Sequence, residues 1–151
     1  MALIPDTIDT VPALVFQRAA THAQEVILRK KQRGIWQAVT WAELATRIRQ
    51  VGMALASSDL ASGDVAGVLS NTRPEAAYAD LGVLSVGCVS ACLVPQNEAD
   101  QVERMLRETR CRLLFVENEE QLDKALETCP DKERDGLQMY QEQLNRMRPR
   151  E

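Results

Sequence analysis

Histidine and lysine are scarce in this sequence, and each scarcity argues against a class of function. The only histidine, His22, has no partner for a hydrolytic triad, and its position indicates the end of a helix. Lysine supplies only four of the 18 basic residues, and the net charge is −4 with a pI near 5.1. A nucleic-acid-binding domain normally carries a basic face, so this balance argues against a nucleic-acid partner.

Glycine-rich phosphate-binding motifs are also missing, because neither Gly-x-Gly-x-x-Gly nor a Walker-type Gly-Lys-Ser/Thr occurs. The nearest candidates for an anion site are Ser57-Ser58 and Ser62-Gly63-Asp64, and both lack a lysine and a following helix. Glu117, Glu119 and Glu120 follow an expected strand, whose carboxyl end could position a site. Their pattern favours an exposed loop and the start of a helix instead.

Cysteine chemistry and membrane insertion are not indicated either. Cys88 and Cys92 fall on an expected strand about 13 Å apart, too far to share a metal ion. The N-terminal residues 1–11 include two acids and no base, unlike a signal peptide. We therefore expect free thiols in a reducing cytosol rather than disulfides. The longest uncharged stretch, 81–97, is broken by glycine and proline, so no integral membrane segment is expected.

What the sequence contains is the pattern of one globular α/β domain of 151 residues, 45% of them hydrophobic. Helix starts are expected at four sites, namely Thr10, Thr40 with Glu43, Thr72 with Glu75, and Asn97. The fourth helix should turn Val102, Met105, Leu106 and Thr109 inward. Ile48 lies in the middle of an apolar helical stripe, so we expect it to be buried.

Strand candidates separate these helices. Two short ones, 26–28 and 35–36, flank a hairpin turn at Lys31–Gly34, where glycine supplies a positive φ. Three apolar segments, 65–69, 88–94 and 112–116, alternate with helices, which is typical of βαβ units. The sequence therefore predicts an α/β fold with a parallel sheet, an N-terminal β-hairpin and a helical tail.

We expect residues 1–130 to form the α/β domain and 131–151 a charged, partly helical tail. The tail is poor in apolar residues, which favours weak packing. The alternative is an amphipathic helix that docks on a partner. Its apolar residues would be Leu137, Met139, Tyr140, Leu144 and Met147.

Four ordered segments carry a family resemblance: 39–44, 62–75, 79–89 and 112–117. The most distinctive piece is Asn-x-Arg-Pro-Glu at 71–75, which joins a strand end to a helix start. Over residues 10–128 the chain resembles the N-terminal region of AMP-forming acyl-CoA synthetases, in the adenylate-forming ligase superfamily. The long-chain fatty-acid branch is the nearest likeness.

The resemblance implies a three-layer, parallel-sheet unit from an enzyme that converts a carboxylate to an acyl-adenylate with ATP, then transfers the acyl group to CoA. ATP, magnesium and CoA are implied for the full-length family and none for this chain. The phosphate loop, magnesium element, ribose aspartate and catalytic lysine of the family have no match here. No catalytic, cofactor-binding or metal residue is therefore assigned. The sequence also departs from the family at Gln96-Asn97-Glu98.

The same resemblance implies a fatty-acid substrate class and a cytoplasmic location, with peripheral membrane association as an option. Truncation, a frameshift or a specialised short paralogue would each explain the missing motifs. Three hypotheses follow. The chain is an N-terminal scaffold portion that is inactive alone, or a non-catalytic module for interaction or oligomerisation, or a small independent nucleotide-binding protein. Its partners would be a second copy or the remainder of the enzyme.

Overall fold

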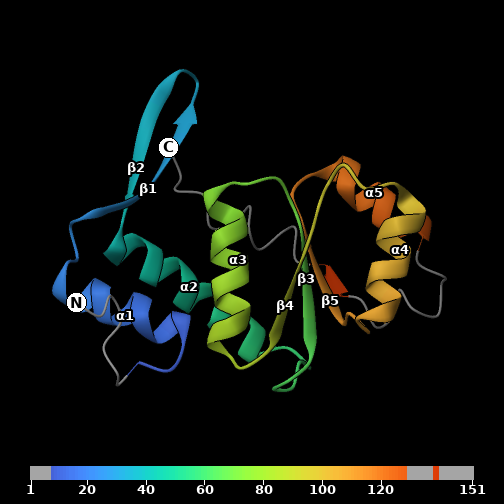
Figure 1. The fold of residues 1–151 in the computed structure, drawn as a ribbon, viewed down its shortest axis with the longest axis horizontal. Helices are drawn as coiled ribbons and strands as arrows, with labels where there is room; N and C mark the ends of the chain where they lie inside the picture. Colours follow the sequence, from blue (N-terminus) through green and yellow to red (C-terminus); the bar gives the residue numbers. More distant parts are fainter. Residues whose placement is uncertain (1–7, 129–137, 140–151) are drawn as a thin grey trace.

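The computed structural model describes residues 8–128 and Gln138–Met139, and the statements below concern those residues. The chain forms an α/β fold, as the sequence predicts (Figure 1). The helices are α1 (Val11–Thr21), α2 (Trp41–Ala56), α3 (Pro74–Ser85), α4 (Ala99–Glu108) and α5 (Glu119–Thr128). The strands are β1 (Val26–Gln32), β2 (Ile35–Thr40), β3 (Val65–Leu69), β4 (Val89–Leu93), β5 (Leu113–Val116) and β6 (Gln138–Met139).

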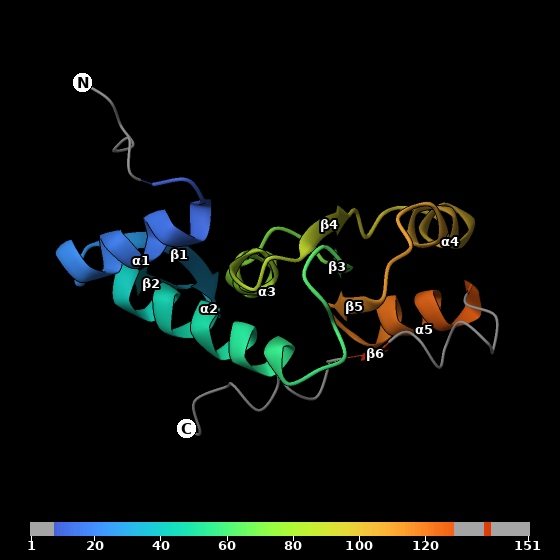
Figure 2. The same ribbon diagram turned by 90° about the horizontal axis from the view of Figure 1, so that it is seen from below.

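The central sheet has the strand order β4-β3-β5-β6, and every pairing in it is parallel. Helices α2 and α3 pack on one face, and α4 and α5 pack on the other (Figure 2). Alternate side chains of β5 show why, because Phe115 points to the first core and Leu114 to the second. The predicted three-layer, parallel-sheet architecture is confirmed.

A third apolar cluster joins α1 and α2 beside this unit, and Ile48 is fully buried in it, as predicted. The β-hairpin of β1 and β2 meets the same cluster through Leu28 and Val39. Its two-residue turn is Arg33-Gly34, and both residues have positive φ, at 49° and 81°. The hairpin is therefore confirmed, although its strands run further than the short apolar segments predicted. Backbone pairing continues through the charged residues 29–31, and most side chains of both strands are exposed, so an apolar pattern is not needed there.

Two predicted helix caps are confirmed. The Thr10 hydroxyl accepts a hydrogen bond from the Ala13 N–H at the start of α1. At α2, Thr40 and Glu43 form the predicted capping box, with each side chain accepting from the other residue's backbone N–H.

Two other predicted starts are displaced. Helix α3 begins at Pro74 after an N-cap at Arg73, so the predicted cap at Thr72 is wrong. The Glu75 carboxylate binds cationic side chains instead of closing a capping box. Helix α4 has Glu98 rather than Asn97 as its N-cap, with the Gln101 side chain accepting from the Glu98 N–H.

The inward face of α4 is confirmed for Val102 and Leu106, which are buried, and for Met105, which packs against the same core. Thr109 is exposed, contrary to expectation, because it lies at the C-cap and its hydroxyl donates to the Met105 carbonyl. The strands predicted at 88–94 and 112–116 begin one residue later than expected, at Val89 and Leu113.

The tail differs from prediction where it is described. Gln138 and Met139 form a strand that pairs with Leu113 and Leu114, so a helix through Met139 is wrong. Leu137, Tyr140, Leu144 and Met147 lie outside the described residues, and so does the predicted boundary between 130 and 131. Among the described residues, no helix has the length and apolarity needed to cross a bilayer.

Candidate functional site

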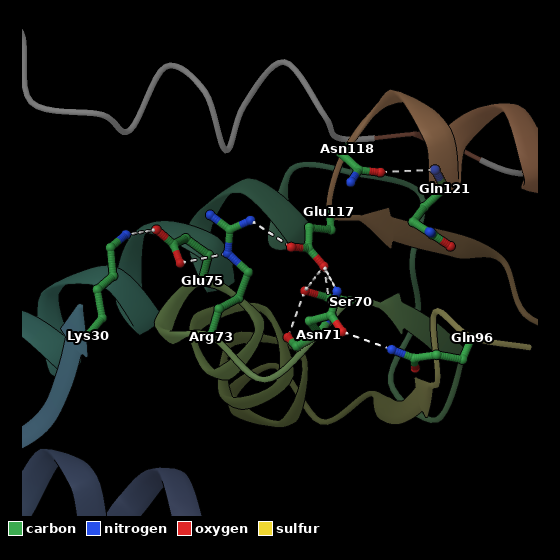
Figure 3. A network of polar contacts seen from close by, with 9 residues as sticks. All are labelled: Lys30, Ser70, Asn71, Arg73, Glu75, Gln96, Glu117, Asn118 and Gln121. Atoms are coloured by element: carbon green, nitrogen blue, oxygen red, sulfur yellow. Dashed lines mark hydrogen bonds and ion pairs between the residues drawn. The ribbon is translucent and has the colours of Figure 1, made fainter. Parts of the chain in front are cut away.

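The strand order places one candidate site at the carboxyl ends of β3 and β5. From β3 the chain moves to β4 on one side, then returns past β3 to β5 on the other. In open α/β sheets ligands commonly bind beyond the strand ends at such a reversal, and we use the word crevice only for this place, the edge of the sheet at the carboxyl ends of β3 and β5. Figure 3 shows that this region is filled by a network of polar side chains.

Glu117, the residue after β5, is the centre of this network. Its Oε2 accepts hydrogen bonds from the backbone N–H of Asn71 at 2.7 Å and from Asn71 Nδ2 at 3.0 Å. Its Oε1 accepts from Arg73 Nη1 at 3.2 Å. The Glu117 side chain is only 15% exposed. The carboxylate therefore takes up donors from the β3–α3 loop that an external anion would otherwise use.

These contacts also fix the charge of Glu117. The Asn71 backbone N–H is the main cause of a lowered Glu117 pKa. Burial opposes this effect, and the Asn71 side chain and Arg73 add to it. The residue is therefore ionised at neutral pH, and its negative charge stays in the crevice.

Arg73 connects this crevice to the hairpin. Its Nε donates to Glu75 Oε2 at 2.9 Å, while Lys30 of β1 donates to Glu75 Oε1 at 2.6 Å (Figure 3). Burial raises the pKa of Glu75, but the hydrogen bonds from Arg73 and Lys30 outweigh it and lower the pKa to about 2. The hydrogen bond to Glu75 is the main reason that the Arg73 pKa is raised. Four alternating charges thus run from β1 to the end of β5.

Amide side chains border the network on its other side. Gln96 Nε2 donates to Asn71 Oδ1 at 3.2 Å, which ties the segment after β4 to the loop after β3. Asn118 Oδ1 accepts from the Gln121 N–H at 3.0 Å and so supports the first turn of α5. The Gln121 side chain is buried, and its Oε1 has no hydrogen-bond partner among the described residues.

The serine-containing candidates prove to be structural. The Ser57 and Ser58 hydroxyls donate to the Ala54 and Leu55 carbonyls at the end of α2. The Ser62 hydroxyl donates to the Gly87 carbonyl, so it ties two loops together.

The remaining candidates lie apart from the crevice. His22 is the C-cap of α1, as predicted. Cys88 is buried and Cys92 is exposed, and both are free thiols. Within the described part of the chain, no cluster of histidine, cysteine, aspartate or glutamate residues could hold a metal ion.

The three glutamates after β5 lie in two different environments. Glu119 and Glu120 are exposed in the first turn of α5, as expected. Glu117 does lie in the loop after β5, but the expected exposure is wrong, because its side chain is only 15% exposed and its carboxylate binds the loop after β3. The sequence singles out residues 71–75 as distinctive, but no pattern in it indicates that Glu117 and Lys30 are their partners. These contacts span about forty-five positions, so no local spacing could reveal them.

The chemistry of this crevice does not fit the phosphates of a nucleotide. A phosphate placed at the Asn71 N–H and Arg73 would have to displace the Glu117 carboxylate and would be repelled by it. A phosphate site needs spare backbone N–H groups and cations, whereas here both are bound to glutamate. The site is therefore a clamp between segments of the chain.

Comparison with known proteins identifies a family that this chain matches. A family model described as AMP-binding enzyme matches residues 15–149. The long-chain-fatty-acid–CoA ligase FadD15 of Mycobacterium bovis is 33% identical over 111 residues, which cover 74% of this chain and 18% of the ligase. The chain thus spans less than a fifth of the length of that relative.

Solved structures agree on the fold. The fatty acid AMP ligase from Legionella pneumophila superposes with a TM-score of 0.71 at 16% identity, covering 78% of this chain and 22% of the other. The O-succinylbenzoate CoA synthetase MenE from Bacillus subtilis, in complex with AMP, gives a TM-score of 0.70 at 21% identity. That match covers 91% of this chain and 33% of MenE.

Proposed function

The chain belongs to the AMP-binding enzyme family, and on that premise we propose that it is an N-terminal scaffold portion of an AMP-forming long-chain acyl-CoA ligase, inactive alone. The complete enzyme would join a fatty acid to AMP and then to CoA. FadD15 is named as a long-chain-fatty-acid–CoA ligase, which supports this substrate class. ATP, magnesium and CoA would be held by other parts of such an enzyme, and its location would be the cytoplasm.

The filled crevice carries this proposal. Adenylate formation needs cations and donors aimed at phosphate groups. At the sheet edge of this chain, Arg73 and the Asn71 N–H are bound to Glu117 instead. Lys30 is likewise bound to Glu75. An arrangement that joins β1, the β3–α3 loop and β5 supports a scaffold role and disfavours an independent nucleotide-binding protein.

Two assays test the proposal. The purified chain is first tested for ATP–pyrophosphate exchange with long-chain fatty acids and magnesium, where no exchange above background is expected. It is then added to a long-chain acyl-CoA ligase that lacks its own corresponding N-terminal region, and acyl-CoA formation is measured. Restored activity supports a scaffold role.

A matched pair of variants makes the second assay specific. Ile48→Ala removes a fully buried side chain and should abolish restoration, whereas Met53→Ala changes an exposed side chain of the same helix and should preserve it. Robust exchange by the isolated chain would overturn the inactivity claim. Failure to restore any ligase, with the chain folded, would leave the interaction-module alternative as the better account.

That alternative rests on a separate observation. The edge strand β4 exposes Val89, and Val94 just beyond its end is also exposed. No described residue pairs with the outer edge of β4, and exposed apolar side chains on such an edge favour association with another chain. The oligomeric state, which is treated in the Discussion, tests this alternative.

A further inference from the structure

The β-hairpin tip combines exposed apolar side chains with a concentration of positive charge. Ile35 and Trp36, directly after the turn, are 69% and 64% exposed. The hairpin residues 26–40 include four bases and no acid, although the whole chain has a net charge of −4. The bases are Arg29, Lys30, Lys31 and Arg33. We call residues 31–36 the hairpin tip.

The register of the hairpin places the two apolar side chains on opposite faces. Trp36 is paired with Lys31, and Ile35 is paired with Gln32. Neighbouring residues of a strand point to opposite sides, so no single flat surface can cover both Ile35 and Trp36. Among the described residues, the tip projects away from the helices, and the side chains of Ile35 and Trp36 remain largely exposed (Figure 1).

This geometry distinguishes between possible occupants. A rigid protein surface would bury one face of the tip and leave the other in water. A fluid layer of lipid headgroups closes around both faces of a narrow projection, and tryptophan is favoured at that depth. The Lys31 ammonium lies 6.0 Å from the centre of the Trp36 ring, a position from which its charge can remain at the headgroup level.

The charge distribution indicates which kind of lipid the hairpin would bind and which end of the chain would face the bilayer. Basic residues near an anionic bilayer surface are each attracted to it. The acidic residues of α5, which include Glu119, Glu120, Asp123 and Glu127, lie at the other end of the long axis from the hairpin (Figure 1). An anionic membrane would therefore attract the hairpin and repel the far end.

From these observations we propose that the hairpin tip docks the chain on anionic lipid bilayers, with Ile35 and Trp36 entering the headgroup region. The proposal is independent of the scaffold role, because no ligase activity enters the argument. It assigns a binding surface to residues outside the crevice, with an anionic phospholipid surface as its ligand.

Co-sedimentation with vesicles tests the proposal. The full chain is mixed with vesicles of phosphatidylcholine alone or of phosphatidylcholine with phosphatidylglycerol. Partitioning into the mixed vesicles, weakened by added salt, is the expected result, with little binding to phosphatidylcholine. Replacing Lys31 and Arg33 by Gln should lower the partition coefficient about fivefold for each charge. Trp36→Ala should lower it on the order of tenfold.

Matched controls separate docking at the tip from other causes. Arg104→Gln removes an exposed charge on α4, and Met53→Ala removes an exposed apolar side chain on α2, and neither should change partitioning. Brominated lipids should quench the fluorescence of the chain, and Trp36→Phe should abolish quenching while largely preserving partitioning. Trp41, at the base of the hairpin, packs against the protein core and serves as the internal reference.

Three results would overturn the proposal. The first is no binding to mixed vesicles, and the second is equal binding to both vesicle types. The third is unchanged partitioning in the Trp36 and Lys31/Arg33 variants while circular dichroism shows them folded. A blue shift of Trp36 fluorescence that depends on protein concentration without lipid would instead assign the tip to a second copy of the chain.

Discussion

Glu117 is the residue on which the crevice depends, because one carboxylate accepts from four donors in a loop more than forty positions away. Replacing it with Gln keeps the shape but removes the charge and one acceptor position. Hydrogen bonds to charged groups contribute about 1.5–3 kcal/mol, so we expect Glu117→Gln to lower the free energy of unfolding by about 1–3 kcal/mol. Urea denaturation measures this loss.

The matched control is Glu108→Gln, which changes an exposed carboxylate at the end of α4. Its effect should stay within about 0.5 kcal/mol, as for ordinary surface substitutions. Equal losses in the two variants would show that the Glu117 contacts stabilise nothing beyond an ordinary surface ion pair.

Glu75 should make the stability of the folded chain depend on pH. Its pKa is about 2 in the folded chain against an ordinary 4.5, so the unfolded chain binds a proton first as the pH falls. The stabilisation is therefore complete above pH 4.5 and is lost as the pH falls towards 2. We expect the stability difference between the native chain and Glu75→Gln to shrink across that window. Urea denaturation at a series of pH values measures it, and a constant difference would contradict the Lys30 and Arg73 contacts.

At the scale of elements, two threonines that look alike in sequence behave differently. Thr40 caps α2, with its hydroxyl accepting from the Glu43 N–H, whereas Thr72 lies before the N-cap of α3. Thr40→Ala should therefore cost about 1 kcal/mol and Thr72→Ala much less. Thermal unfolding of the two variants compares them directly. A larger loss of stability for Thr72→Ala than for Thr40→Ala would support the helix cap at Thr72 that the sequence predicts for α3.

The contact between α2 and α3 depends on a glycine. A Cβ at Gly82 would lie 2.4 Å from Val51 Cγ1, so the two helices approach closely only because Gly82 has no side chain. Alanine is the better helix former by about 1 kcal/mol, but overpacking costs about 1–3 kcal/mol, so Gly82→Ala should destabilise the chain. Adding Val51→Ala should recover part of the loss, and strictly additive losses in denaturation would contradict this packing.

These elements show how far local sequence signals reach. The strand at 65–69 and the box at Thr40 were predictable, because apolar runs and caps act over a few residues. The start of α3 was missed because Glu75 binds Lys30 and Arg73, and the first of these partners is forty-five positions away. The role of Glu117 could not be predicted for the same reason, because its partner Asn71 is 46 positions away in the sequence. Local patterns therefore predicted the layers of the fold, whereas the polar clamp depends on which strand ends the topology brings together.

At the scale of the whole molecule, the two edges of the sheet differ. Within the described part of the chain, β4 pairs with β3 on one side only and Val89 is half exposed, while the opposite edge of β5 is paired with β6. An open, apolar strand edge recruits another chain. We therefore expect a homodimer or larger oligomer at micromolar concentration, formed through β4, with sedimentation velocity as the measurement.

Variants at each edge test this assignment. Val89→Lys places a charge on the β4 edge and should shift the chain towards monomer, whereas Met53→Lys, on an exposed position of α2, should not. Deleting residues 136–151 removes β6 and uncovers the backbone of Leu113 and Leu114, so association should increase. A single monomeric species across the micromolar range, with no binding of a hydrophobic dye, would show that the β4 edge recruits no second chain. In that case the apolar side chains at Val89 and Val94 would favour a different partner, as the scaffold proposal requires.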